Sequence, residues 1–281
     1  MSRHTSFKIG GPADLVAIPS SVDDLRTVLA FCTSESLPWF VMGNGTNLLV
    51  RDKGIRGVVI KLAGTLDRLE IAGETLTAGS GALLRKTSEA AAARGLAGLE
   101  FTHGIPGTVG GAAVMNAGAY DGEMKDVIES VELLSPGDGR VVVLEAAALG
   151  FAYRKSVLQD RSDIVLSATM RLKRGDRPAI LERMSDLDRR RREKQPLDLP
   201  SAGSVFRRPE GAYAGPLIEG AGLKGHRIGG AEVSTVHAGF IVNRGGATAD
   251  DVLEMITFIR DAVLRKYGVE LTPEIKVVGE A

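Results

Sequence analysis

The stretch THGIPGTVGGAAVMNAGAY, residues 102–120, decides how the fold of this chain is to be interpreted. Seven of its nineteen residues are ones that commonly mark turns, and small alanines fill the gaps between them; they are Gly104, Pro106, Gly107, Gly110, Gly111, Asn116 and Gly118. A flat ligand that lies along bare backbone requires such small residues and explains them better than a string of turns. The composition therefore predicts a ligand here without naming it.

Glycine is enriched throughout the chain, and the enrichment is local. The 35 glycines among 281 residues are about 12%, against a usual ~7%. They gather in residues 43–57, 79–122 and 203–246, with no fixed repeat period. In a globular chain such clusters indicate tight turns or backbone that approaches something closely.

Composition excludes several classes of protein. With 44% hydrophobic and 25% charged residues, the chain is able to bury a sizeable core. Lys plus Arg and Asp plus Glu are both 35, and this zero net charge argues against a nucleic-acid partner. The single cysteine, Cys32, rules out an internal disulfide and a thiolate metal cluster, and no metal site is visible. The first residues lack the apolar core of a signal peptide, and no apolar run approaches the ~20 residues of a membrane helix. We expect a cytoplasmic protein that does not bind membranes.

The pattern of residues predicts an α+β fold with mixed sheets and more than one layer. Ser21 precedes an apolar helical stripe that ends near Cys32, and Asp24 is placed as its capping-box partner. A charged helix over 176–196 stops at Pro196 and marks a candidate domain boundary. The other predicted elements are strands at 14–19, 39–43, 57–62, 163–172 and 237–243, a helix at 82–94, a hairpin of 126–135 with 140–144, a helix that buries Val252, Met255, Ile256, Ile259 and Val263, and a strand-like tail at 270–279.

A second glycine-rich stretch, VMGNGTNLLV at residues 41–50, follows a short apolar strand. Its successive small residues allow backbone N–H groups to point into one concavity, which suits a diphosphate. It is not the dinucleotide fingerprint, because Leu48 takes the place of the third glycine and no clear helix follows. It is not a P-loop either, since no Gly-Lys-Ser/Thr comes after it. A tight hairpin turn remains the alternative.

Three isolated side chains are further candidates. Ser204 in SAGSVFRRP resembles a nucleophile elbow, but Phe206 fills the last glycine position and no histidine stands in a triad order. A turn residue and a proton donor remain open for it. Arg154 in FAYRKS forms either a surface salt bridge or part of a site. Glu274 follows Pro273, which holds its backbone extended.

The run Arg189 to Arg192 suggests an anion site at first sight. Four consecutive residues on a helix point in different directions, so few of them are able to reach one ligand. We interpret the run as a solvated face.

Taken together and in order, these stretches closely resemble the UDP-N-acetylenolpyruvoylglucosamine reductase family. The matching segments are TSFKIGGPAD, GNGTNLLV, GIPGTVGGAAVMNAGAY, FAYRKS, SAGSVFRRP and LTPEIKVVG, which run from about Thr5 to Gly279. The resemblance implies a vanillyl-alcohol-oxidase-like (PCMH-type) FAD-binding fold of two α/β subdomains, residues 1–62 and 63–175. It also implies a C-terminal α+β substrate-binding domain at 176–281, whose tail 270–281 returns to the active site.

The resemblance also implies a cofactor and its contacts. FAD, bound non-covalently, would lie along two backbone segments of this sequence. The implied residues are Gly43, Asn44, Gly45, Thr46, Asn47 and Leu48 in the first segment, and Gly104, Ile105, Pro106, Gly107, Val109, Gly110, Gly111, Asn116 and Gly118 in the second.

The implied reaction uses NADPH as hydride donor and UDP-N-acetylglucosamine enolpyruvate as substrate, and it yields UDP-N-acetylmuramate, a peptidoglycan precursor. Arg154 offers a planar fork of donors to the negative charge that develops on the enolpyruvyl carboxylate. Glu274 fits beside that charge only if it is protonated or pairs with the arginine. Ser204 would protonate the carbanion, because even a weak acid suffices for so strong a base.

By the same resemblance, Tyr153, Lys194, Arg208 and His237 would bind substrate. The short segment between Tyr153 and Ser204 lacks the inserted loop with which some members fold a tyrosine over the substrate, so we expect the shorter subclass. Arg208 departs from the asparagine of the better-known subclass. A monomer or weak oligomer is expected. Another flavin enzyme of the same fold and a non-catalytic flavin- or nucleotide-sugar-binding module are the alternatives.

Overall fold

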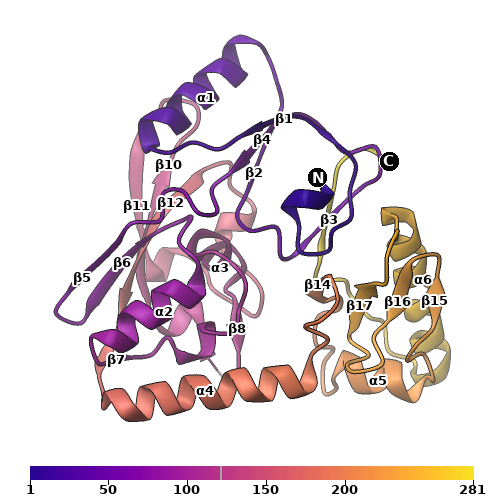
Figure 1. Cartoon of the computed structure of the whole chain (residues 1–281). Coiled ribbons are helices and arrows are strands. Elements are labelled where there is room, and N and C mark those ends of the chain that lie inside the picture. Colours follow the sequence, from indigo (N-terminus) through magenta and orange to yellow (C-terminus); the bar gives the residue numbers. More distant parts are fainter. Residues whose placement is uncertain (121) are drawn as a thin grey trace. The chain divides into compact units, whose positions relative to one another are not determined.

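The structure, a computed structural model, describes residues 1–120 and 122–281. The chain forms two compact units, and it passes from one to the other several times along its length (Figure 1). The larger unit comprises Leu15–Asn44 and Val58–Arg191. The smaller unit comprises Met1–Asp14, Gly45–Gly57 and Arg192–Ala281.

The larger unit is built on a five-stranded antiparallel sheet in the order β11-β10-β12-β6-β5. A three-stranded sheet, β1-β4-β2, pairs β2 and β4 in parallel. Its elements are α1 (Val22–Ser34), α2 (Leu84–Ala93), α3 (Val109–Met115), α4 (Arg177–Lys194), β1 (Ala13–Ala17), β2 (Trp39–Met42), β4 (Ile55–Lys61), β5 (Leu69–Ala72), β6 (Thr75–Gly79), β7 (Leu96–Ala97), β8 (Gly118–Ala119), β9 (Gly122–Glu123), β10 (Ile128–Leu134), β11 (Val141–Glu145), β12 (Ile164–Arg171) and β13 (Lys173–Arg174).

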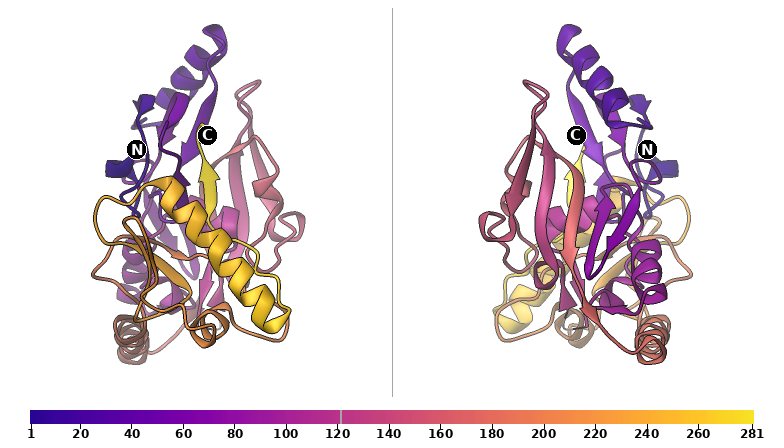
Figure 2. Two further views of the ribbon diagram at one scale, coloured as in Figure 1. Left: turned by 90° about the vertical axis from the view of Figure 1, so that its right-hand side faces the viewer. Right: turned by 90° about the vertical axis from the view of Figure 1, so that its left-hand side faces the viewer.

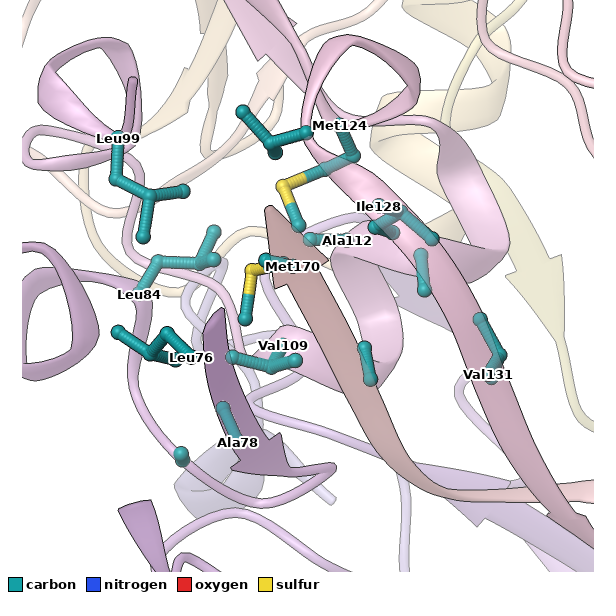
Figure 3. Packing of buried hydrophobic residues seen from close by; sticks show 14 of the residues in the cluster. Leu76, Ala78, Leu84, Leu99, Val109, Ala112, Met124, Ile128, Val131 and Met170 are labelled. Atoms are coloured by element: carbon teal, nitrogen blue, oxygen red, sulfur yellow. The ribbon is translucent and has the colours of Figure 1, made fainter. Parts of the chain in front are cut away.

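The main core of the larger unit lies between the five-stranded sheet and helices α2 and α3. Met170 on β12 and Met124 are fully buried there, and Val109 from the start of α3 packs into the same cluster (Figure 3). Ala112 and Ala113 of α3 are also buried in it. Small side chains on that face let the short helix approach the sheet closely. The alanines of the 102–120 stretch are thus explained in part by core packing.

Helix α1 begins as the sequence predicts, with one difference in its cap. The Ser21 hydroxyl accepts a hydrogen bond from the Asp24 backbone N–H at 3.0 Å, which satisfies an otherwise unpaired amide at the helix start. The Asp24 carboxylate, however, accepts from the Ser20 N–H at 3.0 Å. The predicted capping box at Ser21 is therefore wrong in its second half, because the carboxylate reaches back one residue further along the chain.

The hairpin alternative for residues 41–50 is also excluded. Strand β2 pairs with β4, whereas β3 (Leu48–Val50) pairs in parallel with β18 (Lys276–Val278). The two strands that flank Gly43 to Asn47 thus belong to different sheets. The loop between them is a crossover and not a tight hairpin turn.

The smaller unit contains a four-stranded sheet in the order β14-β17-β16-β15. The long helix α6 (Ala249–Tyr267), drawn in yellow in Figure 2, packs against β15 and β16 of this sheet. The remaining elements are α5 (Ala214–Gly220), β14 (Ser201–Ser204), β15 (Arg227–Ile228), β16 (Ala231–Val233) and β17 (Phe240–Asn243).

Helix α6 confirms the predicted amphipathic pattern, since Val252, Met255, Ile256, Ile259 and Val263 are all buried. The predicted strand 237–243 is three residues too long. His237 to Gly239 form a turn, in which the Phe240 N–H donates to the His237 carbonyl at 2.9 Å, and β17 begins only at Phe240. Within the described residues, no helix is long and apolar enough to cross a membrane.

Candidate functional site

Ser204 and Glu274, the predicted acid and its companion, lie on adjacent backbone segments of the smaller unit. The Glu274 N–H donates to the Val205 carbonyl at 2.7 Å, and the Arg207 N–H donates to the Thr272 carbonyl at 2.9 Å. Residues 204–207 and 272–274 therefore run side by side as an antiparallel pair. Two residues that are 70 positions apart in the sequence are brought together by backbone pairing alone.

The position of Ser204 follows from the glycine before it. Ser204 pairs with Phe240 across β14 and β17, and the register shifts between Ser201 and Ser204. Gly203, which lies in that irregularity, has a φ of 79°, a left-handed conformation that favours glycine. No atom lies within 4 Å of where its Cβ would be, so the glycine is required by backbone conformation and the space beside it is open. The Ser204 side chain is exposed.

Asn47 connects the loop of residues 45–48 to the same place. Its side-chain N–H group donates to the Glu274 carbonyl at 3.3 Å, while its own carbonyl accepts from the Lys276 N–H at 2.9 Å. Three stretches that the sequence singled out, around Asn47, Ser204 and Glu274, thus meet within one unit. The three stretches are far apart in the sequence, so only folding brings them together.

Within the larger unit, the two glycine-rich stretches lie against each other. The Asn44 side chain donates to the Pro106 carbonyl at 2.7 Å. Gly43 packs on Thr108, whose hydroxyl would collide with any Cβ at that position. The close contact fixes the end of β2 against the start of α3, and the glycine is required by this neighbour.

Other glycines of the second stretch are also required by protein neighbours. A Cβ on Gly110 would lie 2.7 Å from that of Ser80, and one on Gly118 would strike the Gly122 carbonyl. Gly104 lies under the Arg191 side chain, and a Cβ added to it would lie 3.0 Å from Arg191 Cδ. Gly111, in contrast, is exposed and has room for a side chain.

Arg154 occupies a tight and strained turn. Ala152 and Lys155 exchange both backbone hydrogen bonds, each at 3.0 Å, and Arg154 between them has a φ of 54°. That left-handed conformation is uncommon for a residue other than glycine. One guanidinium N–H donates to the Gly118 carbonyl at 2.9 Å, and the guanidinium lies 5.1 Å from the centre of the Tyr153 ring.

Asn116, a predicted cofactor contact, is fully buried and has its amide engaged by the protein. Its Nδ2 donates to Ala152 O at 2.9 Å and to Glu123 Oε2 at 3.0 Å, and its Oδ1 accepts from the Lys125 N–H at 2.9 Å. An asparagine side chain has two N–H donors, and both are used here. The structure thus places Asn116 beneath the Arg154 turn.

The four predicted substrate contacts differ in their surroundings. Tyr153 and Lys194 are exposed, and Arg208 stacks on the Tyr213 ring at 4.3 Å. His237 is partly buried between Gly215 and Gly239, and its Nδ1 accepts from the Gly239 N–H at 3.0 Å. Burial lowers the pKa of His237 from its ordinary value, with a smaller contribution from the positive charge of Lys224.

The arginine run on α4 is only partly a solvated face. Arg189, Arg190 and Arg192 are exposed, as expected. Arg191 is half-buried over Gly104, and burial lowers the pKa of its guanidinium. The helical spacing turns this one side chain toward the protein, which sequence reasoning had not distinguished from its neighbours.

The residues present fit a bound dinucleotide cofactor. Within the described part of the chain, the backbone N–H groups of Asn44, Gly45, Thr46 and Asn47 donate no hydrogen bond to protein. Successive amides of this kind form a concavity suited to a diphosphate. Among the described residues, no group of three or more His, Cys, Asp or Glu side chains is arranged to hold a metal ion.

Comparison with known proteins decides the family. The reductase named UDP-N-acetylenolpyruvoylglucosamine reductase in Caldanaerobacter subterraneus is 54% identical over 280 residues, covering all of this chain and 92% of that protein. The protein of the same name in Syntrophomonas wolfei is 50% identical over an equal length and is covered to 93%. The chain belongs to the UDP-N-acetylenolpyruvoylglucosamine reductase family. The resemblance stated from the sequence is confirmed.

Further comparisons support the family and its fold. Residues 13–145 match the FAD binding domain, and residues 195–278 match the C-terminal domain of the reductase family. The crystal structure of the family member from Thermus caldophilus superposes with a TM-score of 0.84 at 39% identity, over 98% of this chain and 96% of that one. The predicted fold, an FAD-binding part followed by a family-specific C-terminal domain, is confirmed.

Sequence reasoning missed three side chains next to the predicted site residues. Gln159 contacts the Arg154 turn, Arg191 covers Gly104, and Tyr213 stacks with Arg208. Gln159 had no signal of its own, because it lies five residues from Arg154 at the end of the short 3-10 helix Val157–Gln159. Only the fold brings its side chain back to that turn.

Proposed function

We propose that this protein catalyses the FAD-dependent, NADPH-consuming reduction of UDP-N-acetylglucosamine enolpyruvate to UDP-N-acetylmuramate. The observation that carries the proposal is the pairing of the Ser204 and Glu274 segments, with Asn47 hydrogen-bonded to the Glu274 carbonyl. A hydroxyl and a carboxyl group are thereby held beside a loop with unpaired amides.

The cofactor would be held by residues 43–48 and by the 104–118 segment. The four successive amides from Asn44 to Asn47 supply donors for its diphosphate. Gly111, exposed at the start of α3, allows close approach of a ligand to the backbone. Bound FAD would supply hydride transfer from NADPH to the terminal carbon of the enolpyruvyl double bond.

Arg154 stabilises the negative charge that the enolpyruvyl group gains. Its planar guanidinium suits bidentate recognition of a carboxylate better than an ammonium group does. The adjacent carbon then carries a carbanion or enolate, and that carbon must receive a proton. Preorganised donors at such a position lower the barrier because they need no reorganisation during the reaction.

Ser204 donates the proton to that carbon, and Glu274 in its protonated form donates a hydrogen bond to the enolate oxygen. The exposed hydroxyl of Ser204 and the open space beside Gly203 support access by substrate. Tyr153, Lys194, Arg208 and His237 bind the rest of the substrate. His237, whose pKa is lowered by burial, acts as a neutral hydrogen-bonding group.

We also propose the domain organisation, the location and the partners of the protein. Residues 1–62 and 63–175 form two FAD-binding subdomains, and residues 176–281 form the substrate-binding domain. The protein acts in the cytoplasm as a monomer or weak oligomer, where its product serves cell-wall synthesis and hence cell shape and division. Its partner is a small molecule, and neither nucleic acid nor membrane takes part.

Purified protein reconstituted with FAD tests the proposal directly. We expect a yellow protein whose flavin absorbance is bleached by NADPH and restored by UDP-N-acetylglucosamine enolpyruvate. A non-catalytic binding module leaves NADPH unconsumed, and another flavin enzyme is bleached but not restored by this substrate. A protein that takes up no FAD refutes both enzyme hypotheses.

The Ser204→Ala variant tests the proton donor. We expect NADPH to bleach the flavin at the normal rate and the enolpyruvyl substrate to restore it about 10²- to 10⁴-fold more slowly, the usual contribution of a positioned acid. Ser201→Ala, three positions away on the same strand β14, is the matched control. Normal restoration in Ser204→Ala shows that another group delivers the proton.

A further inference from the structure

The turn that carries Arg154 is held in place by neighbouring side chains. Arg154 in this turn adopts a left-handed φ of 54°, a conformation that is uncommon for an arginine and that the surrounding structure must support. Two amide side chains bind the carbonyl groups of this turn. Asn116 Nδ2 donates to Ala152 O at 2.9 Å, and Gln159 Nε2 donates to Arg154 O at 2.9 Å.

Asn116 also fixes the group on which the guanidinium rests. Arg154 Nη2 donates to Gly118 O, and Gly118 pairs with Glu123 across β8 and β9. Asn116 binds the Glu123 carboxylate at 3.0 Å and accepts from the Lys125 N–H at 2.9 Å. One buried side chain therefore ties the backbone of the Arg154 turn to the paired strands β8 and β9, whose Gly118 carbonyl accepts from the Arg154 guanidinium.

Gln159 braces the turn from its other side. Besides Arg154 O, its Nε2 donates to Val114 O at 3.2 Å, which anchors the turn to the end of α3. The Ser156 hydroxyl, fully buried, donates to the same Val114 carbonyl at 2.7 Å. A weaker contact joins the same Nε2 to Met115 Sδ at 3.7 Å. Removal of the Gln159 amide thus leaves Val114 O with a partner and takes one from the Arg154 carbonyl and from the Met115 sulfur.

We propose that Asn116 and Gln159 are positioning residues that set the orientation of the Arg154 guanidinium toward the substrate carboxylate. The proposal rests on the proposed function for the role of Arg154. The hydrogen bonds from Asn116 and Gln159 to the turn, called the brace below, are a feature of the fold. A small misplacement of a catalytic group lowers a rate by as much as about 10²-fold. Loss of the brace therefore acts on the step that requires Arg154 and not on hydride delivery by NADPH.

Gln159→Leu is the main test, because it keeps the size of the side chain and removes its donors. We expect restoration of the flavin by the enolpyruvyl substrate to slow about 10- to 100-fold, with bleaching by NADPH unchanged. Thr169→Val is the matched control, since it removes a half-buried hydroxyl contact to Thr77 in the same unit, away from the turn. It is expected to leave both steps at their normal rates.

A double-mutant cycle with Arg154→Ala separates positioning from general destabilisation. If Gln159 acts through Arg154, Gln159→Leu slows restoration in the native background and has no further effect when Arg154 is already absent. The same slowing in both backgrounds, or no slowing in the native one, overturns the proposal. Asn116→Ser, which shortens the side chain that binds Ala152 O, is expected to slow restoration in the native background and to add nothing in the Arg154→Ala background.

A crystal structure of Gln159→Leu decides the brace independently of the reaction. We expect the Arg154 guanidinium to leave the Gly118 carbonyl, now at 2.9 Å from it, or the turn to lose its left-handed residue. An unchanged turn and guanidinium refute the brace even if the reaction is confirmed. If native protein never reduces the enolpyruvyl substrate, the proposed function fails while this structure still tests the brace.

Discussion

Asn243 offers the sharpest test of what holds the smaller unit together. This residue, at the end of β17, is 7% exposed. Its Nδ2 donates to Phe7 O at 3.1 Å, and its Oδ1 accepts from Gly245 N at 2.9 Å and Ala247 N at 3.3 Å. A single amide thereby joins the N-terminal segment to the sheet and orders the loop that leads into α6.

The expected cost of Asn243→Ala follows from these three bonds. Each contributes a net ~1 kcal/mol, so that their loss removes about 3 kcal/mol from the free energy of unfolding. A fourth bond, to Lys8 O at 3.5 Å, is too long to add much. A domain is ordinarily stable by about 5–15 kcal/mol, so the smaller unit would lose a large share of its stability.

Urea unfolding, monitored by hydrogen exchange, measures this cost in each unit separately. Separate measurement matters because a chain of two units need not unfold in one step. Exchange should accelerate in peptides from Phe7 and β17 and stay unchanged in β10 of the larger unit. Thr257→Ala, on the exposed face of α6, is the control and should change stability by less than about 0.5 kcal/mol. A loss below about 1 kcal/mol for Asn243→Ala, or equal acceleration in both units, refutes the reasoning that assigns ~1 kcal/mol to each bond.

Three further outcomes are expected. The Asp52 carboxylate caps the first amides of α6, with Ala249 N at 2.9 Å and Asp250 N at 3.1 Å; Asp52→Ala should cost about 1 kcal/mol in urea unfolding, as loss of a helix cap does. Glu274→Gln keeps an N–H donor where Glu274→Ala keeps none, so stopped-flow restoration of the flavin should be faster in Gln than in Ala; equal rates would exclude hydrogen-bond donation. Because burial lowers the pKa of His237, its imidazole gains a proton at lower pH in the folded protein than in the unfolded chain. The stability that the neutral imidazole contributes is therefore complete above about pH 6.5 and is lost as the pH falls below that value. The acid-induced drop in Tm should be smaller in His237→Gln than in the native protein.

Periodicity predicted most of the fold, because it reports which face of an element is buried. The stripe from Val252 to Val263 and the hairpin of β10 and β11 are both confirmed. Errors arose where local conformation decides the boundary. The strand at 237–243 was drawn too long because residues 237–239 form a turn whose own histidine accepts the Gly239 N–H. Such a contact leaves no trace in hydrophobic patterning.

The candidate site was only partly accessible from sequence for a related reason. Ser204 and Glu274 each carried some local signal, but the backbone pairing that joins them is a long-range contact. Nothing in the sequence indicated that Gln159 and Asn116 bind the carbonyl groups of the Arg154 turn. A side chain that binds a backbone carbonyl group does so at no fixed distance along the sequence, so no pattern reveals it. The family resemblance identified the chemistry, whereas the supports of Arg154 became visible only in the folded chain.

The glycines of the 41–50 and 102–120 stretches show why composition alone leads to a ligand too readily. Gly43, Gly110 and Gly118 each meet a protein atom where a side chain would be, at Thr108, Ser80 and Gly122. Protein neighbours therefore require these three glycines whether or not a cofactor is bound. Of the glycines in residues 102–120, only Gly111 is exposed, and a Cβ added there would meet nothing closer than Thr108 Oγ1 at 3.5 Å. A side chain added at Gly111 should weaken FAD binding and leave the apoprotein stable, whereas one added at Gly110 should destabilise the apoprotein itself. FAD titration and thermal unfolding of Gly111→Ala and Gly110→Ala therefore separate a glycine required by the cofactor from one required by protein packing.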